Sequence, residues 1–390
     1  MVEIVKKSKC VGCSACKLIC PKKAIKMEPN QETGFIYPAI NESLCINCGL
    51  CKKVCPVLKT YNNEIEKKVM AAYSVDENIR KNSSSGGIFS LLAEKVISQE
   101  GIVFGVGMSK DCVKAEHISV ESICDLGKLR GSKYLQSDLG DTFLNIKKAL
   151  IDKKKVLFSG TPCQIAGLKA FLGKDYENLI TVDFICHGVP SPLVWHKYVK
   201  YREMKANSET REIFFRYKKN GWKKFFVKFV FESGEKYEQI VSKDLYMRGF
   251  LTDLYLRRSC FDCKFKNDNY KSDITLADFW GIDKVVPEWN DDKGVSVVVS
   301  NTKKGLSTLK SIKGNINCRA ADFKDLFMYN PSYFKSVNKK FVDKIIYKDF
   351  NRLAFDDFIY KYCGVSIFCK VRRRLHLLTC AIFKRFNFDE

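Results

Sequence analysis

Short apolar segments alternate with polar and glycine-containing segments over most of the chain after residue 68. Continuous apolar runs predict strands over residues 69–75, 102–107 and 156–159. Apolar residues recur with helical spacing over residues 88–97, which predicts a helix that ends before Gly101. The pattern is typical of a domain that mixes strands and helices.

The segment from residue 156 onward has the order strand, helix, strand, helix. Thr161 and Pro162 supply an N-cap and a first-turn proline for a helix that ends at Gly173. An apolar strand over residues 179–185 follows, and then a helix over residues 192–204. This order predicts parallel strands that are joined by a crossover helix.

The next region predicts further elements of both kinds. Alternating residues over 225–231 and 235–241 favour an antiparallel hairpin. We also expect a helix over residues 245–256, a strand over 295–300 and a helix over 303–312. The fold class is therefore α+β or α/β, with a parallel βαβ core and an antiparallel hairpin.

Eight of the 18 cysteines lie in two N-terminal runs that share one spacing. The runs are Cys10-x2-Cys13-x2-Cys16-x3-Cys20-Pro21 and Cys45-x2-Cys48-x2-Cys51-x3-Cys55-Pro56. This is the bacterial two-cluster ferredoxin pattern, in which the fourth cysteine of each run binds the other 4Fe-4S cluster. The predicted ligand sets are Cys10, Cys13, Cys16 and Cys55 for one cluster, and Cys45, Cys48, Cys51 and Cys20 for the other.

Zinc sites and disulfides are the alternative uses of such cysteines. Zinc also binds CxxC pairs, but its four-ligand sites do not require the repeated x2-x2-x3-Pro arrangement. A disulfide framework is typical of small secreted domains, whereas this chain opens with residues 1–7 and no apolar signal segment. We therefore expect reduced thiols and a cytoplasmic location.

The formal charge of +23 favours anionic partners, because 67 basic residues face only 44 acidic ones. The basic residues are scattered and accompany no nucleic-acid-binding motif, so no nucleic acid is expected as a partner. An acidic redox protein is the expected donor. No uninterrupted apolar stretch reaches the roughly 18 residues that a membrane-spanning helix needs.

Four more cysteines are candidates for a third centre. Cys163 and Cys186 each follow a predicted parallel strand, so they should lie at the same edge of the sheet. Cys260-x2-Cys263 is a metal-type pair without a second pair nearby. Together they could bind a third 4Fe-4S cluster or a zinc ion, while the alternative makes Cys163 and Cys186 ordinary small buried residues.

A serine- and glycine-rich segment, residues 83–87, leads directly into the helix predicted over residues 88–97. Free backbone N–H groups at such a helix start can bind a phosphate or pyrophosphate. The alternative is a plain helix cap, which uses the same hydroxyl groups.

Six short motifs follow one another in a fixed order. They are Ser85-Gly86-Gly87, Gly131-Ser132-Lys133-Tyr134, Gly160-Thr161-Pro162-Cys163-Gln164, Cys186-His187-Gly188, Cys260-x2-Cys263 and Ala277-Asp278-Phe279-Trp280-Gly281. From about residue 69 to 320 the chain resembles the coenzyme F-420 hydrogenase/dehydrogenase beta-subunit family. The resemblance implies a FAD-containing iron-sulfur flavoprotein that passes electrons between clusters and a flavin, and then to a substrate that accepts or donates a hydride.

The resemblance also implies roles for individual residues. It assigns Cys163, Cys186, Cys260 and Cys263 to a cluster close to the flavin. The positions expected along the flavin are Ser84, Ser85, Gly86, Gly87, Lys133, Thr161 and Asp278. His187 is a candidate proton donor beside the flavin, and a residue that merely ends a strand is the alternative.

We predict four parts of the chain. Residues 1–58 form a two-cluster ferredoxin domain, residues 69–150 and 151–320 form the two portions of the flavin domain, and residues 321–390 form a basic helical tail. Residues 368–383 predict a basic amphipathic helix in this tail. It either docks on the domain or contacts an anionic membrane surface, which would place the protein at the inner membrane face.

The expected function is that of an oxidoreductase. Electrons would pass from a low-potential donor, such as a ferredoxin or a partner subunit, through the 4Fe-4S clusters to FAD and on to a small-molecule substrate, or in the reverse direction. The alternative is a non-catalytic electron-transfer subunit of a larger redox complex.

Overall fold

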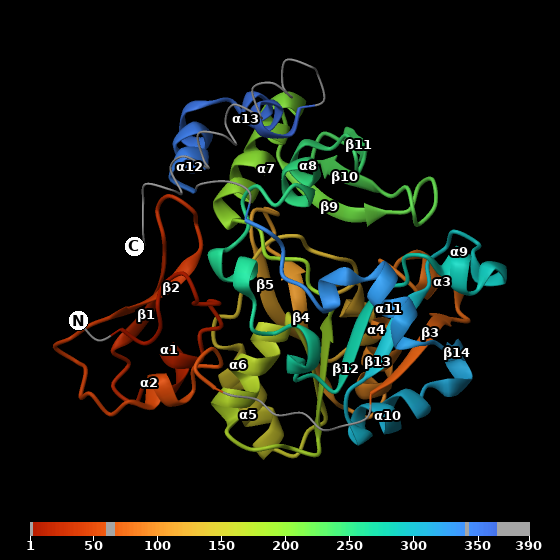
Figure 1. Cartoon of the computed structure of the whole chain (residues 1–390), viewed down its shortest axis with the longest axis horizontal. Helices are drawn as coiled ribbons and strands as arrows, with labels where there is room; N and C mark the ends of the chain where they lie inside the picture. The colour runs from red at the N-terminus through yellow and green to blue at the C-terminus, as the bar shows by residue number, and fades with distance from the viewer. Residues whose placement is uncertain (1–2, 60–66, 340–342, 365–390) are drawn as a thin grey trace.

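The computed structural model describes residues 3–59, 67–339 and 343–364 (Figure 1). A mixed sheet with the strand order β14-β3-β13-β12-β8-β7-β4-β5-β6 forms its centre. The strands are β3 (Lys68–Ser74), β4 (Ile102–Met108), β5 (Ala115–Val120), β6 (Ser137–Asp138), β7 (Val156–Ser159), β8 (Leu179–Phe184), β12 (Ile274–Asp278), β13 (Ser296–Ser300) and β14 (Ile316–Ala320). The predicted mixed α/β class is confirmed.

Four neighbouring strands, β4, β7, β8 and β12, run parallel. Helix α6 (Pro162–Leu172) connects β7 to β8, which confirms the predicted crossover. Strand β3, the first strand of this sheet along the chain, lies between β13 and β14 and is antiparallel to both. The predicted portions 69–150 and 151–320 therefore contribute strands to one sheet.

Side chains alternate between the two faces of this sheet and contact a different layer on each face. On β7, Leu157 packs with α4 (Ile88–Ile97), whereas Phe158 packs with α5 (Thr142–Ile151) and α6. The other helices of the body are α3 (Glu77–Lys81), α9 (Ile282–Val285), α10 (Lys303–Lys310) and α11 (Phe323–Tyr329). The 3-10 helices are η1 (Ile123–Lys128), η2 (Arg258–Asp262), η3 (Asn267–Asn269), η4 (Pro287–Trp289), η5 (Lys313–Asn315) and η6 (Pro331–Tyr333).

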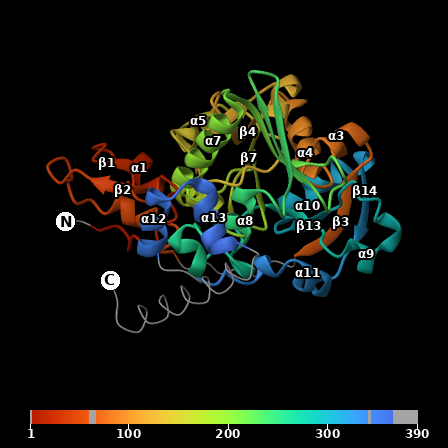
Figure 2. The same ribbon diagram turned by 90° about the horizontal axis from the view of Figure 1, so that it is seen from above.

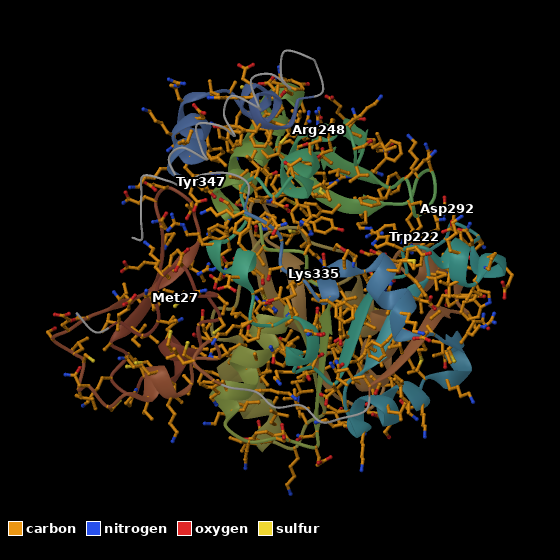
Figure 3. The ribbon with its side chains drawn as sticks, viewed as in Figure 1. Met27, Trp222, Arg248, Asp292, Lys335 and Tyr347 are labelled. Carbon is orange, nitrogen blue, oxygen red and sulfur yellow. The ribbon has the colours of Figure 1, made fainter. Side chains whose placement is uncertain are left out.

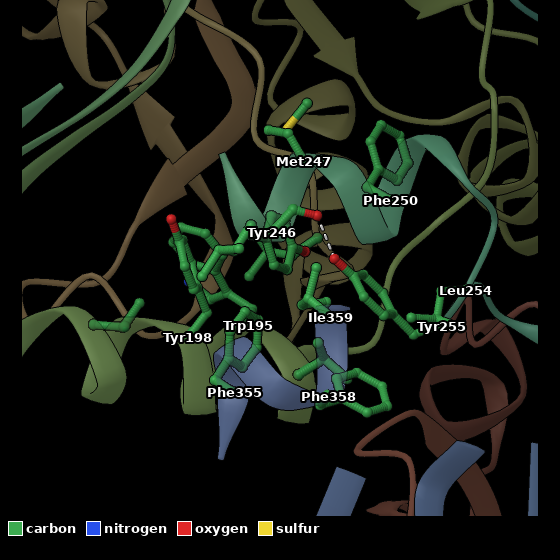
Figure 4. Close-up of a cluster of buried hydrophobic side chains, with 14 of the residues drawn as sticks. Trp195, Tyr198, Tyr246, Met247, Phe250, Leu254, Tyr255, Phe355, Phe358 and Ile359 are labelled. Carbon is green, nitrogen blue, oxygen red and sulfur yellow. Dashed lines mark hydrogen bonds between the residues drawn. The ribbon is translucent and has the colours of Figure 1, made fainter. Parts of the chain in front are cut away.

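A smaller antiparallel sheet stands above the main one and confirms the predicted hairpin (Figure 1). Its strands are β9 (Thr210–Tyr217), β10 (Phe226–Phe231) and β11 (Lys236–Ile240). Helices α7 (Pro192–Ala206), α8 (Leu245–Leu251), α12 (Asp343–Arg352) and α13 (Phe355–Cys363) pack beside it. Figure 4 shows the aromatic core between them, in which the Tyr255 hydroxyl donates to the carbonyl of Tyr246.

Two tail predictions have different outcomes. Helices α12 and α13 confirm a helical segment after residue 321, and both pack into the aromatic core rather than extend away from it. The amphipathic helix expected over residues 368–383 lies outside the described residues.

The prediction of a helix over residues 245–256 is wrong at its C-terminal end. Helix α8 ends at Leu251, and Asp253 adopts a φ of 63°.

The N-terminal ferredoxin module, residues 3–59, lies against α5 and α6 at one end of the molecule (Figures 1 and 2). It contains α1 (Ala15–Ile19), β1 (Ile25–Pro29), β2 (Ile36–Ile40) and α2 (Leu50–Lys53). Strands β1 and β2 pair in an antiparallel ribbon. In the part of the chain that the structure describes, no helix is both long and apolar enough to cross a membrane.

Candidate iron-sulfur and flavin sites

Four thiols of the ferredoxin module surround one pocket, which we call the inner ferredoxin site. The pocket is lined by Cys10, Cys13, Cys16 and Cys55, together with apolar side chains that include Ile4, Val11 and Met27. Cys55 follows α2 and belongs to the second cysteine run, so the structure brings together the set with the exchanged fourth cysteine. Figure 3 labels Met27 within the module.

The thiols of the inner ferredoxin site would ionise only around a cationic centre. Burial raises the pKa of Cys16 to about 12, and the neighbouring thiols of Cys10 and Cys55 act in the same direction. Four thiolates can share this pocket only if positive charge lies between them. An iron-sulfur core supplies that charge, so the residues present fit a 4Fe-4S cluster.

The remaining cysteines of the two runs are the ligands predicted for the second ferredoxin cluster, and we call this set the outer ferredoxin site: Cys20, Cys45, Cys48 and Cys51. Cys48 is exposed, whereas the other three are partly buried. Burial raises the pKa of Cys51, and the neighbouring Cys48 and Cys45 add to this effect. The outer ferredoxin site is thus the more accessible of the two.

A second pocket lies at the C-terminal edge of the parallel strands, and we call it the sheet-edge site. It is lined by Cys163, Cys186, Cys260 and Cys263. Cys163 lies in the first turn of α6, after the N-cap Thr161, and Cys186 follows β8. Because β7 and β8 are parallel, their ends bring these two thiols to the same edge, where the η2 segment adds the other two.

Two cations line the sheet-edge site together with these thiols, Arg257 and Lys266. Burial raises the pKa of Cys163 to about 12 and that of Cys260 to about 11, and the charge of Arg257 acts in the opposite direction on both. The Val189 N–H also donates to Cys260 Sγ at 3.4 Å. These groups stabilise negative charge on the sulfurs, as a thiolate-ligated cluster requires.

The geometry of the sheet-edge site differs from that of a single-ion site. Within residues 3–59, 67–339 and 343–364, no three His, Cys, Asp or Glu side chains converge tightly enough to bind one metal ion. The four thiols surround a pocket instead of a point. This donor set fits a cubane, whose irons each take one thiolate, better than it fits one tetrahedral zinc ion.

The inner ferredoxin site and the sheet-edge site are neighbours. Val11 lines both pockets. Helix α6, which begins next to Cys163, also contacts the module, because a Cβ atom on Gly167 would lie only 2.8 Å from Cys13 Cβ. The chain thus packs the two cysteine sets against each other through a glycine and one valine.

The serine- and glycine-rich segment before α4 contacts a second predicted motif. Ser84 Oγ lies 2.9 Å from Ser132 Oγ and accepts the Ser132 N–H at 2.8 Å. Ser85 Oγ donates to the carbonyl of Val295, and the Gly86 N–H donates to Ser296 Oγ. These polar groups therefore already have protein partners.

Packing and backbone conformation both require glycine at two positions of this segment. A Cβ on Gly86 would lie 2.5 Å from the carbonyl oxygen of Ala72, so only glycine fits against β3. Gly87 is the N-cap of α4 and has a φ of 91°. The conformation of the segment is thus set by its packing against β3. The first backbone N–H groups of α4 come directly after this segment.

Lys218, which follows β9, holds the serine- and glycine-rich segment in place through hydrogen bonds. It belongs to none of the sequence motifs described above. Its Nζ donates to the carbonyls of Arg80, Ser85 and Lys293 at 2.7 to 2.9 Å. Burial lowers the pKa of Lys218 to about 7, and the nearby Arg216 contributes in the same direction.

Asp278 is bound by protein groups. Arg216 forms a two-pronged ion pair with its carboxylate at 2.5 and 3.1 Å, and Trp222 Nε1 donates to it at 2.8 Å. Trp222 stacks on Trp280 with ring centroids 5.0 Å apart. In the described part of the chain, the buried Nε of Arg216 has no hydrogen-bond partner. Figure 3 shows Trp222 next to Asp292, to whose carbonyl its backbone N–H donates.

Lys133 and Thr161, two further predicted flavin residues, have polar partners of their own. Lys133 Nζ donates to the carbonyls of Lys128 and Arg130, and burial lowers its pKa to about 7. Thr161 Oγ1 lies 3.1 Å from Cys163 Sγ. Thr161 therefore belongs geometrically to the sheet-edge site.

His187 lies between the sheet-edge site and the aromatic core. It lines the pocket, and its Nε2 is 2.6 Å from Asp253 Oδ1. Its ring meets Phe250 edge to face, with centroids 5.3 Å apart. The carboxylate of Asp253 thus orients an imidazole that remains about one third exposed.

Comparison with known proteins identifies two kinds of domain. Two models describe the N-terminal and C-terminal parts of the beta subunit of coenzyme F420 hydrogenase/dehydrogenase, and they match residues 69–142 and 153–325. Together they cover more than half of the chain. Two models described as 4Fe-4S dicluster domains match residues 9–58 and 44–90.

Among solved structures, the chain is similar to one from the F420-reducing [NiFe] hydrogenase complex of Methanosarcina barkeri, studied by xenon derivatization. The identity is 19%, the match covers 67% of this chain and 85% of that chain, and the TM-score is 0.44. Comparison with curated proteins gives no match. On the family models, the chain belongs to the coenzyme F420 hydrogenase/dehydrogenase beta-subunit family and carries an N-terminal 4Fe-4S dicluster module.

Proposed function

We propose that this protein is an iron-sulfur flavoprotein oxidoreductase that passes electrons through three 4Fe-4S clusters to FAD and on to a hydride-accepting substrate, or in the reverse direction. Its family membership already makes it an iron-sulfur electron-transfer protein of the oxidoreductase class. The proposal adds the third cluster, the flavin and the hydride substrate.

One observation carries the proposal: the sheet-edge site contains four thiols and shares Val11 with the inner ferredoxin site. A third cluster at this position would continue the series that the ferredoxin module begins. The exposed Cys48 makes the outer ferredoxin site the natural point of contact with a donor protein. Separate one-electron centres in series are useful when the final acceptor needs paired electrons.

Bound FAD would supply the conversion between single electrons and a hydride. The start of α4 would bind its pyrophosphate, since the first N–H groups of a helix and its dipole favour an anion. Ser84 and Ser132 would lie along the cofactor, and the buried Nε of Arg216 offers a donor without a protein partner among the described residues. His187, oriented by Asp253, is the candidate for proton transfer.

The test is cofactor analysis of anaerobically purified full-length protein. We expect about twelve iron atoms per chain, at four per cubane, and non-covalent FAD. A reproducible value of about eight in fully loaded protein would refute the third cluster. Twelve iron atoms without flavin would refute the flavin while leaving the third cluster in place.

A specific observation favours the alternative, a non-catalytic electron-transfer subunit. The hydroxyls of Ser84 and Ser85 and the N–H of Gly86 all have protein partners, so this segment needs no ligand to satisfy them. A flavin-free chain that transfers electrons only after a partner protein is added would establish this alternative. Reduction of a small substrate by the purified chain alone would establish the enzyme.

A further inference from the structure

Arg257 is a buried cation between the ferredoxin module and the body. Only 2% of its surface is exposed. Its guanidinium donates to the carbonyl of Cys10 at 2.7 Å, to Gln136 Oε1 at 2.9 Å and to the carbonyl of Ile36 at 2.9 Å. It also lies over the Tyr37 ring, 4.4 Å from the centroid. Two of its three acceptors belong to the module.

All three hydrogen-bond acceptors are neutral. Over the residues that the structure describes, Arg257 has no carboxylate within ion-pair distance, whereas the adjacent Arg258 pairs with Asp343. Burying a cation without a counter-charge is costly. The sheet-edge site, which Arg257 lines together with four cysteines, is where such a counter-charge would lie when the cysteines are thiolates.

Arg257 therefore contacts both the inner ferredoxin site and the sheet-edge site. Its Nε donates to the carbonyl of Cys10, a cysteine of the inner ferredoxin site, and the residue also lines the pocket around Cys163, Cys186, Cys260 and Cys263. Gly12, near Cys10, packs closely against the same side chain, because a Cβ there would lie 2.7 Å from Gln136 Nε2 and 3.0 Å from Arg257 Nη1. Val11 completes the contact between the two pockets.

We propose that Arg257 is a positioning residue that fixes the ferredoxin module against the sheet-edge site and, as the buried counter-charge of that site, makes its cluster easier to reduce. This inference rests on the proposed function, because it requires the third cluster. In the transfer concerned, one electron leaves the inner ferredoxin site and enters the sheet-edge site, and no bond forms or breaks. A fixed positive charge stabilises the more negative, reduced form of a cluster, so the charge of Arg257 raises the potential of the sheet-edge site.

The experiment compares Arg257→Met, Arg257→Gln and Arg257→Lys in the full-length, anaerobically reconstituted protein. Arg258→Met is the matched control, since Arg258 is adjacent in sequence but about half exposed. The readouts are iron content and the midpoint potential of each cluster, from a redox titration followed by electron paramagnetic resonance.

We expect the neutral variants to make reduction of the sheet-edge site at least tenfold less favourable. For a one-electron couple this is a decrease of about 59 mV in the sheet-edge potential. Arg257→Lys keeps the charge and should restore most of the difference. Arg258→Met should leave all potentials unchanged.

The other possible outcomes would overturn either the role of Arg257 or the third cluster. Unchanged potentials in a neutral variant with about twelve iron atoms overturn the counter-charge role of Arg257 and leave the proposed function intact. An equal shift in the Met, Gln and Lys variants also overturns it, because the effect would then follow packing and not charge. If Arg257→Met fails to assemble clusters, the comparison of Gln with Lys decides. Wild-type protein with about eight iron atoms refutes the third cluster, and the inference with it.

Discussion

At the scale of single residues, two buried cations lie beside the sheet-edge site. Arg257 and Lys266 both line this pocket. Such groups are costly to bury unless they are hydrogen-bonded and balanced by negative charge. Their presence at this edge of the sheet therefore supports an anionic cofactor there.

Cys260→Ala should remove the third cluster and leave the ferredoxin clusters in place. Cys260 lines the sheet-edge pocket and does not line the inner ferredoxin pocket. A buried cubane that lacks one thiolate is lost or changed in potential. We expect iron to fall from about twelve to about eight per chain, with slower flavin reduction. Cys124→Ala, at an exposed cysteine, is the control and should change neither.

His117 should make stability depend on pH. Burial lowers its pKa to about 4, so the imidazole is neutral in the folded protein at pH 7. Between about pH 6.5 and pH 4 the unfolded chain binds the extra proton, so the stability from this residue is lost as the pH falls through that window. From pH 7 to pH 5 the loss should be about 2 kcal/mol.

Replacement of His117 by Gln tests this prediction, because the amide can still donate to the carbonyl of Ser159, which His117 Nε2 contacts at 3.2 Å. Anaerobic unfolding at pH 7 and pH 5 should show a smaller loss in the variant. An identical loss in the variant and the parent would assign the pH dependence to other groups.

At the scale of elements, α6 connects two redox sites. Its first turn contains Cys163, and Gly167, one turn later, contacts Cys13 of the module. The Pro162 start and the Gly173 end of this helix are evident in the sequence. One short helix thus fixes the spacing between the inner ferredoxin site and the sheet-edge site.

The start of α4 offers a test of the flavin position. Gly87→Asp should lower the FAD content several-fold, because a carboxylate at this N-terminus repels the pyrophosphate. Gly87 has a φ of 91°, so any side chain there is strained, and Gly87→Ala measures that strain alone. Both variants should keep their 4Fe-4S signals. Equal FAD content in the Asp and Ala variants would place the pyrophosphate elsewhere.

The sequence predicts correctly those helices and strands that depend on short, local residue patterns. The apolar runs of β7 and β8 and the proline and glycine limits of α6 are such signals, and the structure confirms all three. The place of β3 between β13 and β14 depends on pairing across more than two hundred residues, which local patterns do not encode. Arg257, Lys218 and Arg216 escape notice because a buried cation and a surface cation look alike in a sequence.

At the scale of the whole molecule, the ferredoxin module and the body have separate cysteine sets. Removal of residues 1–58 should leave a flavoprotein that a small artificial reductant still reduces, because the sheet-edge site and the flavin residues lie downstream. Reduction by a protein donor should fall at least tenfold. Equal reduction of the truncated and full chains by a ferredoxin would refute the serial path.

The same truncation should also lower stability. The module covers Ala166 and Phe265, and Arg257 would lose its contacts with the carbonyls of Cys10 and Ile36. The melting temperature of the truncated chain should therefore fall by several degrees. The control is the full chain with Cys124→Ala, a change at an exposed cysteine that keeps the module and its cluster ligands in place.

The position of β3 has a consequence for how the protein is made. The module leaves the ribosome first and can accept its clusters early, whereas β3 must wait for β13 and β14, roughly 220 residues later. At about 5 to 20 residues per second this delay lasts roughly 10 to 45 s. Cys163 and Cys186 remain free thiols until the segment that contains Cys260 and Cys263 is synthesised. A cluster at the sheet-edge site would thus be the last of the three to assemble.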